Sequence, residues 1–473
     1  MKRWLILATM LCVLPVLSPA QSLDEAIRLA QDSAITAFQS RYEYQYYQLK
    51  HEQFEALRKP QLNFSLIPNY RRMLIDPTRD YVYLRNFDRF STFAELRLSQ
   101  KVLGLGGEAY VGSQALWSEY FARDYQTNPR DFVVAPLIVG YQQPLLGYNS
   151  HRWEKVVEDQ KLETARKQHE LDLRLIAEET TRRYFRLACA QGRLDMCERN
   201  KQTADTLYAI AKEKASIAMI TLAELRSLEL QRLNAANALL DARNEEQLAR
   251  ASLLAYLRVD DPGSVFDGRL TVPDSARPVQ MTEEEATRMA MSNSAALQRK
   301  QTAIAEARQQ QERARREAGV KVGLDLNVGM QQISNNFAGV FANQQFYMLG
   351  VVTVSVPILD HGAARKGYEA ATAWKSRQEQ ALREEERALV EDVHNTLDNL
   401  RSHQQMLSHT TEAVTMADEV FELTAENYAN GLCDINTYSL AQSRRDNAYN
   451  QHLAALANYW TTYYHLLTLT QHE

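Results

Sequence analysis

The chain has 473 residues, 24% of them charged and 45% hydrophobic, with a formal net charge of −5. Basic and acidic residues are mixed along the whole sequence, so nothing in the charge balance suggests nucleic-acid binding, and we expect no nucleic-acid partner. Length alone predicts about three domains, and an internal repeat overrides that estimate where one is present.

The first twenty residues have the three parts of a secretory signal peptide. Lys2 and Arg3 precede the apolar run 4–17, and small residues follow at 18–20. We expect cleavage after Ala20 rather than a retained membrane anchor, because the apolar run is short for a membrane span. No later run reaches ~18 apolar residues, so we expect no transmembrane helix in the mature chain.

A helix is expected over residues 22–58, with Ser22 as its N-cap and acidic residues in its first turn. Strands are expected over residues 61–146, where apolar and short polar side chains alternate. Within this region, residues 71–131 allow two interpretations: an additional strand hairpin or a large extracellular loop. The alternation there favours strands, because it reaches membrane-spanning length.

Helical periodicity returns after the strands. A long helix is expected over residues 152–214, on the order of 95 Å in length. After a break, a shorter helix follows over residues 222–257. Residues 258–281 are the Pro/Gly-rich linker in the middle of the chain.

The same order of elements then recurs. Residues 320–331 alternate strictly between apolar and polar side chains, the clearest strand signal in the chain. The second half is predicted to contain a helix 282–317, a β hairpin 319–359, a long helix 363–430 and a short helix 435–470. We interpret residues 21–257 and 282–473 as two internal structural repeats.

The helix lengths favour an end-to-end arrangement. Each short helix is a little over half the length of each long one, so two stacked short helices would match one long helix. We expect helix 222–257 to lead into helix 282–317, and helix 435–470 to end where helix 22–58 begins. One chain would then supply four helical columns, each about 100 Å high.

The strands decide between two interpretations of these helices. Their faces are rich in Ala, Gln, Asn and charged residues, which fits either a solvated coiled coil or a wall that lines water. Isolated hairpins are not stable, and strands in a membrane close into a barrel because no edge can stay unpaired. One chain offers four to six strands, so closure requires an oligomer.

No motif for catalysis or metal binding stands out. The histidines are scattered, and the sequence has no HExxH, GxSxG or Cys–His cluster. Cys189 and Cys197 lie eight residues apart on a predicted helix, about 12 Å along its axis, which is too far for a disulfide. We predict no enzyme activity, no cofactor and no metal site.

The residues resemble the outer-membrane efflux proteins of the TolC type across essentially the whole mature chain. The resemblance is carried by the order and spacing of short motifs: Leu23-Asp24-Glu25-Ala26, Pro60, Val356-Pro357-Ile358-Leu359-Asp360-His361-Gly362 and Tyr428-Ala429-Asn430-Gly431. It implies a mainly α fold with membrane β structure: a long α-helical barrel of coiled-coil hairpins, joined to a transmembrane β-barrel that a homotrimer shares. The linker and termini would form an equatorial belt.

The resemblance also implies a place and a task. The protein would lie in the outer membrane of a Gram-negative bacterium, in contact with its lipid, with a tunnel into the periplasm. It would be the passive exit duct of a tripartite efflux or type I secretion system. Its partners would be a periplasmic adaptor protein and an inner-membrane pump of the RND or ABC type. The alternative is a pore-less periplasmic coiled-coil scaffold or adaptor, which would not need the alternating strands.

The resemblance places the gate and the adaptor-docking tips at the two helix breaks. The tips would be Ser216 and Ile217 at the first break, and Gly431 and Leu432 at the second. Tyr428 matches the family's gating tyrosine, three residues before the glycine. Because the first break has Ser216 where the second has Gly431, its turn need not use a positive φ.

The acidic rings that narrow some members' pores are not carried over. They fall six and nine residues after the glycine, where this chain has Thr437 and Leu440. Asp434 and Glu224 lie near these positions, and we take both as candidate substitutes in the gate.

Overall fold

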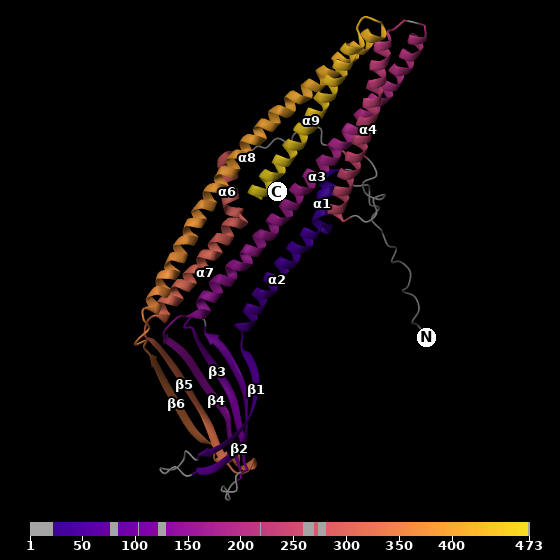
Figure 1. Ribbon diagram of the computed structural model, residues 1–473. Coiled ribbons are helices and arrows are strands. Elements are labelled where there is room, and N and C mark those ends of the chain that lie inside the picture. Colours follow the sequence, from indigo (N-terminus) through magenta and orange to yellow (C-terminus); the bar gives the residue numbers. More distant parts are fainter. Residues whose placement is uncertain are drawn as a thin grey trace, which may run out of the picture. The chain divides into compact units, whose positions relative to one another are not determined.

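A computed structural model describes residues 22–75, 84–102, 104–121, 129–217, 219–258, 269–272 and 281–471 (Figure 1). The predicted signal peptide 1–20, most of the linker 258–281 and parts of the region 71–131 lie outside the described residues.

The chain divides into two compact units. The first, named here the tip unit, comprises the described residues of Met1–Tyr44, Arg166–Ala295 and Glu385–Glu473. The second, the sheet unit, comprises those of Gln45–Ala165 and Ala296–Glu384.

The sheet unit contains a six-stranded antiparallel sheet in the sequential order β1-β2-β3-β4-β5-β6. Its strands are β1 (Gln61–Ile75), β2 (Leu84–Val102), β3 (Gly107–Tyr120), β4 (Arg130–Leu146), β5 (Lys321–Ser334) and β6 (Gln345–Ser355). A short 3₁₀ helix, η1 (Ala338–Phe341), lies between β5 and β6. The described residues of the region 71–131 therefore include the strands β2 and β3, in agreement with the strand interpretation of that region.

Corresponding helices of the two halves of the chain have equal lengths. The pairs have 11, 23, 67 and 36 residues, in chain order: α1 (Leu23–Ser33) and α6 (Glu283–Asn293), α2 (Ile35–Leu57) and α7 (Ala295–Glu317), α3 (Ser150–Ser216) and α8 (Ala363–Ala429), α4 (Leu222–Leu257) and α9 (Ile435–Thr470).

In none of the described helices does an apolar stretch reach the length and hydropathy that a bilayer crossing demands.

The predictions of single helices over 22–58 and 282–317 were wrong, since each region contains two helices. Ala34 ends α1 in an extended conformation, with φ −64° and ψ 144°, and Ser294 ends α6 with φ −54° and ψ 118°. At the first break the carbonyl of Ala34 already accepts hydrogen bonds from the amides of Ala37 and Phe38, so α2 begins at once. Ser33 at the first break, and Asn293 and Ser294 at the second, weaken the helix, because their side chains compete for backbone hydrogen bonds.

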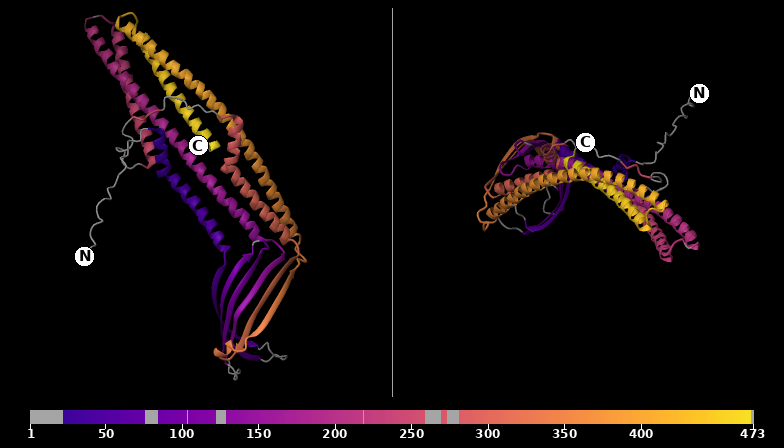
Figure 2. Two further views of the ribbon diagram at one scale, coloured as in Figure 1. Left: turned by 180° about the vertical axis from the view of Figure 1, so that it is seen from behind. Right: turned by 90° about the horizontal axis from the view of Figure 1, so that it is seen from above.

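The expected end-to-end order of the short helices was also wrong. In the tip unit the end of α4 contacts α1, and α9 contacts α6 (Figures 1 and 2). The Ser33 hydroxyl lies 2.7 Å from the backbone oxygen of Leu257, and the Asn293 amide donates to the backbone oxygen of Thr470 at 3.0 Å. The last turn of a helix leaves carbonyls without partners, and the Asn293 amide satisfies one of them at the end of α9. The Ser33 hydroxyl lies between the backbone oxygens of Leu257 and Leu29, which is 2.6 Å away.

One hydrophobic core holds the tip unit together around these helix ends. Its largest fully buried side chains include Trp460, Tyr459, Tyr184 and Phe185. The rings of Phe185 and Trp460 stack with centroids 6.5 Å apart, which joins α3 to α9. The Tyr184 hydroxyl donates to the backbone oxygen of Thr271 at 2.8 Å, so a described part of the linker is attached to the same core.

Candidate functional site: the helical hairpin tips

The turn between α8 and α9 is a Schellman motif centred on Gly431. The amide of Leu432 donates to the backbone oxygen of Asn427 at 2.8 Å, and the amide of Gly431 donates to that of Tyr428 at 3.1 Å. Gly431 has φ +73°, a conformation that only glycine adopts without steric cost. The glycine of the predicted second tip therefore ends the long helix sharply.

Asp434 begins α9 as its N-cap. Its Oδ1 accepts hydrogen bonds from the amide of Thr437 at 2.9 Å and from the hydroxyl of Thr437 at 2.6 Å. These bonds favour the charged form, and they lower the pKa of the Asp434 carboxyl. Thr437, at one of the two positions where the resemblance places an acidic ring, is thus the capping partner of Asp434.

The turn between α3 and α4 is built differently. The Ser216 hydroxyl donates to the backbone oxygen of Glu213 at 2.6 Å, and neither Ser216 nor Ile217 has a positive φ. Thr221 and Glu224 form a capping box: the Glu224 carboxylate accepts from the Thr221 amide at 2.8 Å, and the Thr221 hydroxyl accepts from the Glu224 amide at 3.2 Å. Glu224, like Asp434, is engaged at a helix N-terminus.

Both turns expose apolar side chains. Ile217 is 65% exposed and Leu432 is 75% exposed; Met219 and Leu222 beside the first turn are exposed as well. Leu440, the second position of the acidic rings in the resemblance, is also an exposed apolar side chain. Exposed apolar side chains that gather at one place on a surface are typical of interaction sites.

Tyr428 belongs to an aromatic cluster just behind the second turn. Its ring centroid lies 5.2 Å from that of Tyr438, which lies 5.5 Å from that of Phe421. The Arg445 guanidinium stands 4.1 Å above the Phe421 ring. Burial, with a smaller contribution from Cys433 and Glu224, raises the pKa of the Tyr428 hydroxyl. This cluster holds the end of α8 against the start of α9.

Arg445 also connects this cluster to the other helical hairpin. Its Nη2 lies 3.2 Å from Oδ1 of Asn200 on α3 and 3.0 Å from Oδ1 of Asp446. The Asn200 amide in turn donates to Asp446, and Gln231 on α4 donates to the Ser439 hydroxyl on α9 at 3.2 Å. Polar contacts therefore tie the two hairpins of one chain to each other.

Sequence reasoning did not find Tyr438, Phe421, Arg445 or Asn200. A usable signal exists: Phe421 precedes Tyr428 by seven residues, and Tyr438 precedes Arg445 by seven. That spacing places each pair on one face of its helix, two turns apart.

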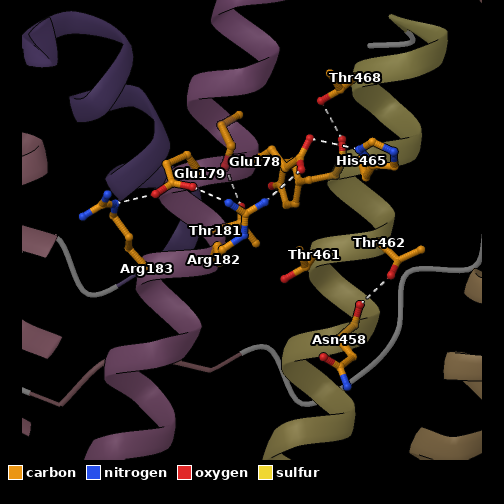
Figure 3. Close-up of polar contacts among 12 residues, drawn as sticks. Glu178, Glu179, Thr181, Arg182, Arg183, Asn458, Thr461, Thr462, His465 and Thr468 are labelled. Atoms are coloured by element: carbon orange, nitrogen blue, oxygen red, sulfur yellow. Dashed lines mark hydrogen bonds and ion pairs between the residues drawn. The ribbon is translucent and has the colours of Figure 1, made fainter. Parts of the chain in front are cut away.

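A second polar cluster lies in the tip unit between α3 and α9 (Figure 3), and Asp392 on α8 adds to it. His465 Nδ1 is 3.2 Å from Oε2 of Glu178, and His465 Nε2 is 3.8 Å from Oδ1 of Asp392. Arg182 reaches Oε1 of Glu178 at 3.2 Å and also pairs with Glu179. The hydrogen bond to Glu178 is the main cause that raises the pKa of His465, and Asp392 adds to it.

Among the described residues, His51, Glu55 and Asp159 bring three metal-ligating side chains within 4.8 Å of one another. His51 Nε2 lies 3.1 Å from Oδ1 of Asp159, which joins α2 to α3, and Glu55 pairs with Arg58. We assign these contacts to helix packing.

Comparison with known proteins supports the resemblance. Residues 286–470 match the family model of the outer membrane efflux protein. No curated protein matches the sequence.

Several solved structures share the fold. The outer membrane protein VceC of Vibrio cholerae superposes with a TM-score of 0.69 at 12% identity, covering 95% of this chain and 95% of its own. The CmeC outer membrane channel of Campylobacter jejuni gives a TM-score of 0.70 at 10% identity, covering 95% and 85%. The MtrE outer membrane channel of Neisseria gonorrhoeae, in its open state, gives 0.63 at 12% identity, covering 96% and 89%.

The fold is thus that of outer-membrane efflux channels, and residues 286–470 match the outer membrane efflux protein family. The predicted resemblance to this family is confirmed.

Proposed function

We propose that this protein is the outer-membrane exit duct of a tripartite efflux or type I secretion system. It would pass solutes through a gated channel and carry out no chemistry of its own. One observation supports this most strongly. A single chain joins a six-stranded antiparallel sheet to two 67-residue helices, and both helices end in exposed apolar turns.

The working form is a homotrimer in the outer membrane of a Gram-negative bacterium. The sheet of one chain has two edges, and a membrane sheet needs closure because lipid satisfies no backbone hydrogen bond. The apolar face of the closed sheet would contact outer-membrane lipid, and the helices would extend into the periplasm as a tunnel. The equal lengths of corresponding helices support an origin by internal duplication.

We place the gate at the tips of the two helical hairpins. In the closed state, the contacts of Tyr428 with Tyr438 and of Arg445 with Asn200 would hold the hairpins together. A periplasmic adaptor would dock on the exposed turns at Ser216-Ile217 and Gly431-Leu432 and favour the open arrangement. The adaptor would link the duct to an inner-membrane pump of the RND or ABC type.

Asp434 and Glu224 act in this proposal through the helix ends they cap. Their carboxylates accept hydrogen bonds from Thr437 and Thr221, so each one shapes the turn beside it. A variant at either position would alter the gate by loosening a helix terminus.

Fractionation of cells that express the full chain tests the proposal. We expect recovery with outer membranes, heat-modifiable migration in gels and trimers after chemical crosslinking. Recovery of the mature protein wholly in the soluble periplasm would overturn it. Affinity capture from crosslinked cells, followed by mass spectrometry of inner-membrane proteins, would then identify the adaptor and the pump.

A further inference from the structure

The two edges of the sheet carry large apolar side chains. On β1, Leu62 is 65% exposed and Phe64 is 68% exposed; on β6, Phe346 and Met348 are exposed to a similar degree. A long apolar edge strand is a template for pairing with another strand. In the proposed trimer, the strand that each edge meets belongs to a second copy of this chain.

Strands β2 and β3 belong to the sheet over their whole length and do not form an extracellular loop. One row of directly paired residues crosses all six strands, and each of its members is apolar: Leu62, Leu98, Val111, Val139, Val328 and Met348. The row passes through β2 and β3 without a polar interruption. That continuity is what a lipid-facing surface requires.

The opposite face of the same strands gathers polar and charged groups. The Arg97 guanidinium on β2 lies 3.7 Å from the ring centroid of Tyr110 on β3, and its Nη2 lies 3.8 Å from Glu108. Further along the sheet, Gln142 on β4 donates to Asp325 on β5 at 2.9 Å. The hairpin β2–β3 therefore follows the same division into an apolar and a polar face as the rest of the sheet.

Close packing also fixes β3 against β4. Tyr110 is directly paired with Gly140, and a Cβ atom added to Gly140 would overlap the ring of Tyr110. The tyrosine ring thus occupies the space that a side chain at residue 140 would need. Aromatic residues that cover a glycine on the neighbouring strand fix the register of a sheet.

The six strands together are about as wide as the four helical segments of the sheet unit to which they connect, named here the helical stems. Contacts place the stems side by side in the order α2, α3, α7, α8: His51 to Asp159, Thr164 to Thr302, and Gln311 to Thr372. Four helices at about 8–10 Å spacing span roughly 32–40 Å. Six strands about 4.8 Å apart and tilted by about 40° span roughly 38 Å, whereas four strands would span only about 25 Å.

We propose that β1 of each copy pairs with β6 of the next, and that three copies close a barrel of eighteen strands, six from each chain. This rests on the proposed function, which supplies the membrane and the three copies. Barrel diameter grows about linearly with strand number, so the bore is roughly 1.5 times as wide as four strands per copy would give. The hairpin β2–β3 is the widening element, and the outer pore admits correspondingly bulkier solutes.

Disulfide trapping tests the edge pairing in the full chain. In a background with Cys189, Cys197 and Cys433 changed to serine, Asn63→Cys on β1 is combined in turn with cysteines at Tyr347, Leu349, Val351 and Thr353 on β6. Register pairs place residue 63 and these four positions on the same face of the sheet. We expect mild oxidation to yield covalent trimers, and nothing larger, for at least one combination.

Phe64→Cys, with the same four partners, is the matched control. Its Cβ points to the other face, so no disulfide can form within the allowed Cβ–Cβ distance. Protein that reaches the outer membrane but forms no β1–β6 crosslink, or that forms ladders beyond three copies, would overturn the inference. Absence from the outer membrane would instead overturn the proposed function.

The bore is measured separately in planar bilayers. Polyethylene glycols of graded size, added only on the side of the barrel mouth, report the outer pore independently of the tips. A variant that lacks residues 84–120 should exclude smaller polymers than the wild type, with a cut-off diameter lower by a factor of about 1.5. An equal cut-off for the two proteins would contradict the inference. If the variant fails to assemble, the wild type alone still tests the inference. A polymer cut-off diameter of the wild type no larger than that of a twelve-stranded barrel would contradict it.

Discussion

The Nδ2 atom of Asn293 lies 3.0 Å from the backbone oxygen of Thr470 and donates a hydrogen bond to it. Asn293 is the last residue of α6, and Thr470 is the last residue of α9. Ser33 and Leu257 hold the corresponding places in the first half of the chain, with Oγ and O 2.7 Å apart. The last residue of α1 thus contacts the end of α4, and the last residue of α6 contacts the end of α9, in each case within the same half of the chain.

Replacement of Asn293 by alanine should lower the free energy of unfolding by about 1 kcal/mol. The substitution removes the donor and leaves the carbonyl of Thr470 without this partner. Thr415→Ala is the control, because the Thr415 hydroxyl bonds only to Thr411 within its own helix in the contacts described. Thermal unfolding of the purified protein measures both variants, and equal midpoints would argue against a joining role for Asn293.

Replacement of Arg445 by methionine should raise the single-channel conductance several-fold. The variant keeps most of the side-chain volume but loses the contacts with Phe421 and Asn200 that hold the tips. Arg444→Met is the matched control, since Arg444 is the exposed neighbour on the same helix. We expect the control to conduct like the wild type in planar bilayers, and closed channels in Arg445→Met would remove this residue from the proposed gate.

Two variants at Asp434 distinguish the effect of its N-cap hydrogen bonds on conductance from the effect of its charge. Asp434→Ala should weaken the start of α9 and raise conductance, because the bonds to Thr437 are lost. Asp434→Asn keeps an oxygen that can accept the same bonds, so it should behave nearly as the wild type. If both variants open the channel to the same extent, the charge and not the cap controls the tip.

Gly431→Ala should destabilise the second turn by about 1–2 kcal/mol. The residue has φ +73°, and a Cβ in that conformation approaches the backbone too closely. Gly367→Ala should instead be neutral or stabilising, because Gly367 lies within α8 and an added Cβ meets no atom within 4 Å. Limited proteolysis at the tip would report the difference, and similar cleavage of the two variants would contradict the strained turn.

The contact of His465 with Glu178 and Asp392 should stabilise the protein more in acid than in alkali. Glu178 and Asp392 raise the pKa of His465 in the folded protein. The contact therefore makes its full contribution to the free energy of unfolding below a pH of about 6.5, the ordinary pKa of histidine. That contribution is lost as the pH rises through the raised folded-state value. The wild type should therefore exceed His465→Gln in thermal midpoint at about pH 5 and differ little from it at about pH 9.

His409→Gln is the control for this measurement, because His409 is an exposed histidine on α8. A difference between the wild type and His465→Gln that stays constant with pH would assign His465 a packing role alone.

Local patterns in the sequence predict much of this molecule. Strict alternation at 320–331 identifies β5, and Gly431 after a long helical run identifies the second tip. These features depend on neighbours within a few residues, so periodicity and turn chemistry reveal them. The resemblance to outer-membrane efflux proteins follows from the order of such features along the chain.

Tertiary contacts decided what local patterns cannot. The breaks at Ala34 and Ser294 and the pairing of α1 with α4 and of α6 with α9 reversed the order expected from the sequence. The joining hydrogen bonds connect residues 224 and 177 positions apart, and the bond between Arg445 and Asn200 spans 245. Because an unpaired helix end accepts any donor that packing brings to it, the partner depends on the folded core and not on the neighbouring sequence.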